Sequence, residues 1–292
     1  MKSELILITR HYHEDELRCW LNWHLNIIHI DRILVLDNES RIDVKTICDS
    51  FQDDRVKYCF ISGDGVDQYE VYNSYLSELD TDSNWVMALD DDEFLYIGEK
   101  YHHNVNEMLK DFYEKYHCNK CYAQWINFYS KHKMEEKTDL YINTHTYYSF
   151  EAAQKLIATF KNGCNRYGKC LFRNEDGLKY IYRRCTGRWV GHSPKCLNGD
   201  DTLRLQSGEI LESDWVNFNN EINTDCFIAH YQFKNKRDWR IKCLRPLIAN
   251  PRVAPNKENM QFVYDYLYKF SYMFKSCALL KDLYNSYQFS VT

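Results

Sequence analysis

Short apolar runs alternate with helical patterns through the first hundred residues, and this alternation constrains the fold more than any other feature of the chain. Runs of strand length lie at 5–8, 33–36, 56–61 and 85–89. Apolar positions at helical spacing predict helices over 14–28, 41–50 and 67–80. Strands and helices that alternate in this way predict an α/β fold with a mostly parallel, Rossmann-like sheet and helices on both faces.

The remainder of the chain gives weaker signals. Short strands are expected at 121–128, 168–174, 178–184 and 226–231. Helices are expected over 104–116, 236–248 and 257–286, whereas 141–150 fits either a strand or a loop. No linker marks a boundary, so we expect one domain over 1–255 and a helical C-terminal extension over 256–292 packed on it.

Composition excludes several classes of protein. The net charge of −5 and the sequence pI near 6.1 argue against a protein built to grip nucleic acid. No run of about 18 apolar residues is present, so no membrane-spanning helix is expected. The chain opens without a secretory pattern, and its 12 cysteines show no regular framework, which favours free thiols in a cytoplasmic protein. Cys118 and Cys121 have the spacing of half a zinc site, but no second pair accompanies them.

Four acidic residues, Asp90 to Glu93, follow directly on the fourth apolar run. Ligands bind beyond the carboxyl ends of parallel strands, and Asp37 ends the second run at the same edge. On an extended chain, Asp90 and Asp92 would point to one side and Asp91 to the other. Two carboxylates on one side suit Mn²⁺ or Mg²⁺, with diphosphate oxygens completing the shell. The alternative is a solvated acidic turn or a helix N-cap.

The order of the motifs along the chain resembles a known family. An Asp-x-Asp after the fourth strand, with an Asp at the end of the second, resembles the nucleotide-binding half of GT-A glycosyltransferases, and in detail the family 2-like and family 92-like enzymes. The matching residues are Arg10, His13, Glu14, Leu17, Trp20 and His24, then 36–40 with Asp43, then Gln68, Asn73, 84–85, 90–94 and 230–235. The match is good over 5–97, patchy over 118–200, and returns at 228–245.

Three positions depart from the family's pattern. His13 stands where Asn is usual, and Asn235 stands where Ser is usual. The glycine-containing acceptor segment that is usual after the middle Trp is replaced by 125–130. These departures bear on the identity of the donor and the acceptor more than on the fold.

The resemblance implies a nucleotide-sugar site with a bound metal ion. The residues that it places at the nucleotide or diphosphate are Arg10, Glu14, Asp37, Gln68, Asp90, Asp91 and Lys234. Those that it places at Mn²⁺ or Mg²⁺ are Asp90, Asp92 and His230, with Glu93 orienting nearby groups. His192 is a second candidate of the same class as His230.

Each of these residues also has an ordinary structural interpretation. Asp37 could stabilise a turn at Asn38 and Glu39, and Gln68 could be an exposed residue at a helix start. A lone histidine such as His230 is more often structural than ligating, and Lys234 could belong to a solvated basic turn. A basic stretch over 161–173, which includes Lys169, fits either a phosphate-facing strand or a charged hairpin.

An inverting transferase, which the resemblance implies, needs a carboxylate that deprotonates the acceptor hydroxyl. The candidates are Glu151, Asp200 and Asp201, with Asp176 and Asp214 as further carboxylates of the same kind. Asp200 and Asp201 fall about where related enzymes place an acidic pair. Any one of these residues could equally be a surface carboxylate.

We therefore expect a metal-dependent glycosyltransferase that moves a sugar from a nucleotide-sugar, such as a UDP-sugar, to a glycan or lipid-linked glycan in polysaccharide biosynthesis. A nucleotidyltransferase is the first alternative, although 9–12 is not the glycine-rich basic loop that such enzymes carry after the first strand. A non-catalytic carbohydrate-binding protein is the second. The aromatic residues over 264–279 predict a core or capping helix. The other interpretation is contact with the inner face of the membrane.

Overall fold

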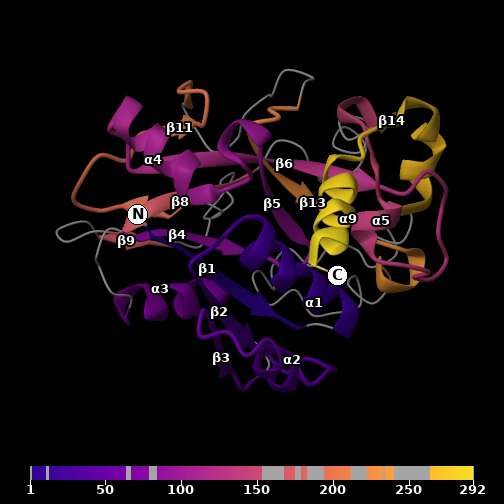
Figure 1. Cartoon of the computed structure of the whole chain (residues 1–292), viewed down its shortest axis with the longest axis horizontal. Helices are drawn as coiled ribbons and strands as arrows, with labels where there is room; N and C mark the ends of the chain where they lie inside the picture. Colours follow the sequence, from indigo (N-terminus) through magenta and orange to yellow (C-terminus); the bar gives the residue numbers. More distant parts are fainter. Residues whose placement is uncertain are drawn as a thin grey trace.

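A large sheet runs through the middle of the protein in the computed structural model (Figure 1). The structure describes residues 2–10, 13–63, 67–78, 84–152, 168–174, 179–182, 194–211, 222–232, 234–239 and 264–291. The strand order along the main path of the sheet is β12-β11-β6-β8-β4-β1-β2-β3. These strands are β1 Lys2–Thr9, β2 Arg32–Asp37, β3 Val56–Phe60, β4 Asn84–Leu89, β6 Lys120–Tyr129, β8 Gly168–Asn174, β11 Leu203–Leu205 and β12 Ile210–Leu211.

The first four strands form the parallel half of the sheet. β1 pairs in parallel with both β2 and β4, and β2 pairs in parallel with β3. The register sets Thr9 beside Asp37 and Leu7 beside Leu89. The carboxyl ends of β1, β2 and β4 therefore lie at one edge of the sheet, where the sequence predicts a binding site.

The second half of the sheet is mixed. β8 runs antiparallel to both β4 and β6, so β6 has the direction of β4. Strand β13 (Cys226–His230) pairs in parallel with the middle of β6 and antiparallel with β5 (Glu93–Ile97). Through these two pairings, the end of β13 reaches the acidic residues that follow β4. A separate small pair joins β9 (Tyr180–Ile181) to β10 (Lys195–Cys196).

Helices cover both faces of the sheet, as the sequence predicts. The principal core contains residues of α1 (Glu14–Asn22), α2 (Val44–Ser50) and α4 (Val105–Tyr116) with one face of β1, β2 and β4. On the opposite face, Tyr72 of α3 (Gln68–Glu78) packs with Ile6, Leu36 and Val86 in a second cluster. The expectation of an α/β fold with a mostly parallel sheet is confirmed.

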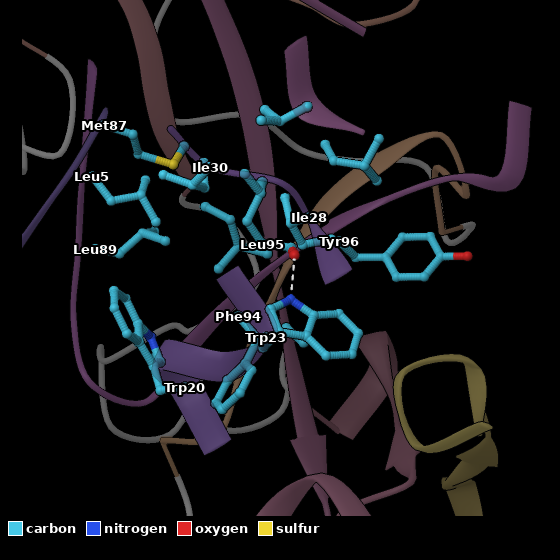
Figure 2. Close-up of a cluster of buried hydrophobic side chains, with 14 of the residues drawn as sticks. Leu5, Trp20, Trp23, Ile28, Ile30, Met87, Leu89, Phe94, Leu95 and Tyr96 are labelled. Carbon is cyan, nitrogen blue, oxygen red and sulfur yellow. Dashed lines mark hydrogen bonds between the residues drawn. The ribbon is translucent and has the colours of Figure 1, made fainter. Parts of the chain in front are cut away.

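Two buried tryptophans of the principal core join α1 and η1 to β5. Figure 2 shows Trp20 and Trp23 among Leu5, Leu89 and Leu95 on the sheet. The indole Nε1 of Trp23 donates to the carbonyl of Leu95 at 2.7 Å, and that of Trp20 donates to the carbonyl of Glu93 at 2.7 Å. Both indoles are fully buried, so each polar nitrogen finds a partner without leaving the core.

Several element boundaries differ from the prediction. The helix expected over 14–28 divides into α1 and a π-helical turn η1 (Trp23–Ile27). The helix expected over 41–50 begins later than predicted: α2 begins after Asp43, whose carboxylate accepts from the backbone N–H of Thr46 at 3.0 Å. Strand β5 was not predicted at all.

The C-terminal third also differs from a simple helical extension. The helix expected over 257–286 is interrupted: a 3₁₀ turn η4 (Tyr268–Met273) and strand β14 (Lys275–Ser276) precede α9 (Leu279–Val291). β14 pairs with β7 (Tyr147–Tyr148), which follows the short α5 (Tyr141–Thr144) and pairs with the end of β6. A 3₁₀ turn η2 (Glu99–Tyr101) precedes α4.

Three further expectations concern the cysteine pair, the helix expected over 236–248 and membrane-spanning helices. Cys118 and Cys121 are buried free thiols, as predicted. Only 236–239 of the helix expected over 236–248 lies within the described residues, and it is helical there. Among the helices in the described part of the chain, none is both long and apolar enough to cross a membrane.

Candidate functional site

The acidic residues after β4 form a tight turn at the carboxyl edge of the parallel strands. The backbone N–H of Glu93 donates to the carbonyl of Asp90 at 3.1 Å, and the Asp90 N–H donates to Glu93 Oε2 at 2.8 Å. Because the chain turns here, side chains do not alternate as on an extended strand. The expectation that Asp90 and Asp92 form one pair, with Asp91 opposed to them, is therefore wrong. The acidic turn, residues 90–93, sends its carboxylates to different partners.

Asp90 faces α3 and β8. Its Oδ1 accepts from Gln68 Nε2 at 3.4 Å, and its Oδ2 lies 3.3 Å from Lys169 Nζ. Gln68 also donates to the hydroxyl of Tyr72 at 2.7 Å. A small pocket is lined by Gln68, Tyr69, Tyr72, Ala88, Asp90, Lys169 and Tyr182. The Asp90 side chain remains 38% exposed, so it can accept hydrogen bonds from a ligand in this pocket.

Asp91 turns toward the end of β1. The hydroxyl of Thr9 donates to Asp91 Oδ2 at 3.0 Å. Thr9 is paired with Asp37 in the β1–β2 register, so this hydrogen bond ties the acidic turn to the neighbouring strand ends.

Asp92 turns in the third direction, toward β13. Its Oδ1 lies 3.6 Å from His230 Nε2, and both side chains are buried. The backbone N–H of Tyr231 donates to the Asp92 carbonyl at 2.8 Å, which fixes the turn against the end of β13. The ring of Trp125 lies 4.8 Å from that of His230 and covers it.

The residues at the turn fit a metal ion only in part. Within the described residues, no group of three or more His, Cys, Asp or Glu side chains is arranged to hold one. Asp92 Oδ1 and His230 Nε2 could nevertheless bind one ion together, because two ligands at about 2.1 Å from a cation can stand up to about 4.2 Å apart. A carboxylate and an imidazole are suitable ligands for Mn²⁺. Asp90, the third predicted ligand, contacts Lys169 and Gln68 instead.

Lys169 is the cation that the fold itself brings to the acidic turn. Its Nζ lies 2.7 Å from Glu93 Oε2, and the residue is 4% exposed. Burial alone would lower the pKa of Lys169, but the carboxylates of Asp90 and Glu93 outweigh burial and raise it. Burial raises the pKa of Glu93, and the Lys169 ammonium opposes that shift.

Arg10 and Asp37 lie at the ends of β1 and β2, as predicted. The Nε of Arg10 donates to the Asn38 carbonyl at 2.7 Å, and its guanidinium lies 3.8 Å from Glu39. Asp37 Oδ1 accepts from the backbone N–H of Ser40 at 2.9 Å, as the turn interpretation of Asp37 requires. Asp37 thus stabilises the turn that follows β2, at the same edge of the sheet as the acidic turn.

Two predicted nucleotide contacts lie apart from the acidic turn. Glu14 is exposed on α1, and its carboxylate accepts from Arg18 Nε at 2.9 Å. The carbonyl of Lys234 accepts from His145 Nε2 at 2.9 Å, and Lys234 Nζ lies 5.6 Å from the ring centre of Tyr141. Lys234 therefore belongs to a polar group beside the start of α1.

The predicted catalytic carboxylates are dispersed. Asp201 accepts from Lys120 Nζ at 2.8 Å, at the amino end of β6 and away from the acidic turn. Asp200 accepts from the Thr202 N–H and hydroxyl in an exposed turn. Glu151 is exposed and follows β7, which pairs with the carboxyl end of β6. The remaining candidates Asp176, Asp214 and His192 lie outside the described residues.

Two residues of the site were not predicted there. Thr9 carried no signal beyond its place after an apolar run. Lys169 had a signal, since it belongs to the basic stretch over 161–173 that fits a phosphate-facing strand; in the structure it lies in β8 and pairs with Asp90 and Glu93. Only glycine fits beside it: a Cβ at Gly168 would lie 2.1 Å from the Ala123 carbonyl, so β8 approaches β6 closely at this point.

No protein-family model matches the chain, and no curated protein matches it. Among solved structures, S. aureus TarS 1–349 aligns with a TM-score of 0.37 and 13% identity over 93% of this chain and 73% of that one. The same fragment in complex with UDP aligns with a TM-score of 0.35 and 13% identity. That alignment covers 60% of this chain and 47% of that one. A 4-diphosphocytidyl-2C-methyl-D-erythritol synthase from Anaerococcus prevotii aligns with a TM-score of 0.28 and 17% identity, over 47% of this chain and 58% of that one. Similarity at this level assigns the chain to no family.

Proposed function

We propose that this protein is a glycosyltransferase that binds a nucleotide-sugar diphosphate, in the first instance a UDP-sugar, at the acidic turn. One observation carries the proposal: Asp92 and His230, which are far apart in sequence, meet at 3.6 Å at the carboxyl edge of the parallel strands. Ligands of α/β sheets bind at this edge. A divalent ion held there would neutralise the charge that develops on a departing diphosphate.

The surrounding residues have distinct roles in this proposal. Asp90 accepts hydrogen bonds from the ribose hydroxyls, because its partly exposed carboxylate faces the small pocket beside Gln68. Thr9 holds Asp91, and Arg10 and Asp37 stabilise the turn after β2 at the same edge of the sheet. Asp200 and Asp201 have no part in it, since they lie away from the turn. The acceptor is a glycan or a lipid-linked glycan, and Glu151 is the described candidate for its base on the carboxyl side of the sheet.

The test is a thermal-shift series with UDP, other nucleoside diphosphates, UDP-sugars and CTP, each with Mn²⁺ or with EDTA. A ligand at about 100 times its Kd stabilises the native state by about 2.7 kcal/mol, which is readily measured. We expect UDP and UDP-sugars to raise Tm only with Mn²⁺. A response to CTP but not to UDP would favour a nucleotidyltransferase, and no response to any nucleotide would contradict the proposal.

Two variants place that response at the turn. Asp92→Asn and His230→Ala should each remove the Mn²⁺-dependent shift and the Mn²⁺-dependent hydrolysis of the donor. Asp49→Asn is the matched control, because Asp49 is exposed on α2 and its carboxylate pairs with the exposed Lys45. An unchanged Mn²⁺-dependent shift in Asp92→Asn would show that the ion binds elsewhere.

A further inference from the structure

Lys169 is a buried lysine in β8, next to the buried apolar residues Cys170, Leu171 and Phe172 of the same strand. Lysine is rarely buried to this degree unless it is paired, and here Nζ lies 2.7 Å from Glu93 and 3.3 Å from Asp90. It also lies 5.9 Å from the ring centre of Trp125. The close approach of β8 to β6 at Gly168 fixes the backbone position of the neighbouring Lys169. The strand pairing therefore fixes the position of Lys169, which is not a flexible side chain on the surface.

The lysine divides the acidic turn into two parts. One oxygen each of Asp90 and Glu93 faces the ammonium. Asp92 instead faces His230 on β13, and Asp91 accepts from Thr9. Without the ammonium, Asp90 and Glu93 would offer neighbouring carboxylate oxygens, which are the ligands that hard divalent cations take.

We propose that Lys169 is a positioning residue that keeps Asp90 and Glu93 from binding a divalent ion and turns Asp90 toward the ribose pocket. The ion is thereby confined to Asp92 and His230. The assignment of Asp90 to a ribose rests on the proposed function, whereas the exclusion of a second ion does not.

The contacts of Asp90 support its role at the ribose rather than at the ion. Its Oδ2 is held by Lys169 on one side and its Oδ1 by Gln68 on the other, so the carboxylate plane is set by two hydrogen-bond donors. Gln68 is itself held by the Tyr72 hydroxyl at 2.7 Å. A carboxylate oriented in this way beside a pocket can accept from two neighbouring hydroxyls of a ribose.

The first experiment measures Mn²⁺ binding to the whole protein without nucleotide, by electron paramagnetic resonance of free Mn²⁺. Lys169→Met should bind Mn²⁺ about tenfold more tightly than the wild type, or bind an additional ion, because two carboxylates lose their internal cation. Lys169→Arg keeps the charge and should resemble the wild type. Equal Mn²⁺ binding by the wild type and Lys169→Met would overturn the proposal, as would weaker binding by a folded Lys169→Met.

A second variant tests the exclusion of the ion by Lys169 if Lys169→Met does not fold. Lys169→Met combined with Glu93→Gln removes the buried negative charge together with the positive one and leaves Asp90 alone to gain the ion. We expect it to bind Mn²⁺ more tightly than Glu93→Gln alone. Equal binding by these two variants would refute a role for Lys169 in excluding the ion.

The second experiment compares UDP with 2′-deoxy-UDP by calorimetry. The wild type should favour UDP by about tenfold, and Lys169→Met should lose that preference because Asp90 is no longer oriented. A preserved preference would refute the positioning of Asp90. If the wild type binds neither nucleotide, the proposed function fails together with the ribose assignment, while the Mn²⁺ comparison still decides whether Lys169 excludes an ion.

Discussion

Asp238 accepts hydrogen bonds from residues that lie far apart in the sequence. Its Oδ2 lies 2.8 Å from His13 Nε2 and accepts from Asn235 Nδ2 at 2.9 Å and from the Tyr141 hydroxyl. Burial would raise the pKa of Asp238, but the hydrogen bonds from His13 and Tyr141 outweigh it and lower the pKa to about 2. His13 and Asn235 are the two single-residue departures from the family's pattern, and they meet at one carboxylate. Nothing in the sequence could show that they are neighbours.

Glu16 should make the stability of the protein depend on pH. This residue is 3% exposed on α1, and burial raises the pKa of its carboxyl from 4.5 to about 7, although the Tyr141 N–H and Lys137 oppose the shift. Since the folded pKa is the higher one, the native state binds more protons than the unfolded chain between these values. The free energy of unfolding should therefore fall as pH rises from 4.5 through 7, by up to about 3 kcal/mol from this group.

Glu16→Gln should remove that part of the pH dependence. Urea unfolding at a series of pH values across this window measures it, as the difference between variant and wild type. Glu14→Gln is the matched control, because Glu14 is an exposed neighbour whose ion pair with Arg18 contributes little. A constant difference between Glu16→Gln and the wild type across the window would contradict the assignment.

At the scale of elements, β5 is the strand that sequence reasoning could not find. It is five residues long, is buried on both faces, and begins within the acidic turn. Its only strand partner in the described part of the chain is β13, more than a hundred residues later. A short buried strand of this kind has no alternation, so its partner alone reveals it. Because β5 was not predicted, the pairing of β5 with β13 that brings His230 to Asp92 could not be predicted either.

Two indole hydrogen bonds link α1 and η1 to β5, and they form a matched pair for mutation. Trp20→Phe and Trp23→Phe should each cost about 1–3 kcal/mol, because each leaves a buried carbonyl without its donor. The carbonyl that Trp20 contacts belongs to Glu93 in the acidic turn, whereas that of Trp23 belongs to Leu95. Only Trp20→Phe should also weaken the Mn²⁺-dependent UDP response.

Chemical unfolding and thermal shift measure the two effects separately. An equal loss of the nucleotide response in both variants would indicate a general loosening of the core. An unchanged response in Trp20→Phe would show that α1 does not position the turn.

At the scale of the whole molecule, the C-terminal helix belongs to the principal core. Leu280 and Tyr284 of α9 are buried in the same cluster as Leu17 and Trp20 of α1, and Figure 1 shows α9 beside the sheet near α5. The aromatic residues that precede α9 form a smaller cluster in which Tyr264 and Leu267 are fully buried. Tyr272 is the exception, at 76% exposed.

Leu280→Ala should therefore destabilise the protein as a whole. Removal of a fully buried leucine side chain typically costs about 2–5 kcal/mol, and one cooperative transition should remain. Leu279→Ala is the control on the same helix, because Leu279 is 37% exposed and Leu280 only 2%. Separate unfolding of the C-terminal segment, seen as a second transition in calorimetry, would contradict a shared core.

The sequence by itself determined the α/β class, the parallel direction of the first strands, and the edge at which Asp37 and the acidic residues gather. These follow from local periodicity and from the rule that parallel strands end on one side. Only the tertiary structure decided the partners of each carboxylate: Lys169 for Asp90 and Glu93, Thr9 for Asp91, and His230 for Asp92. A turn replaces the extended geometry at this point, and the partners come from strands whose pairing no local pattern encodes. Contacts of this kind depend on which strands become neighbours in the folded sheet.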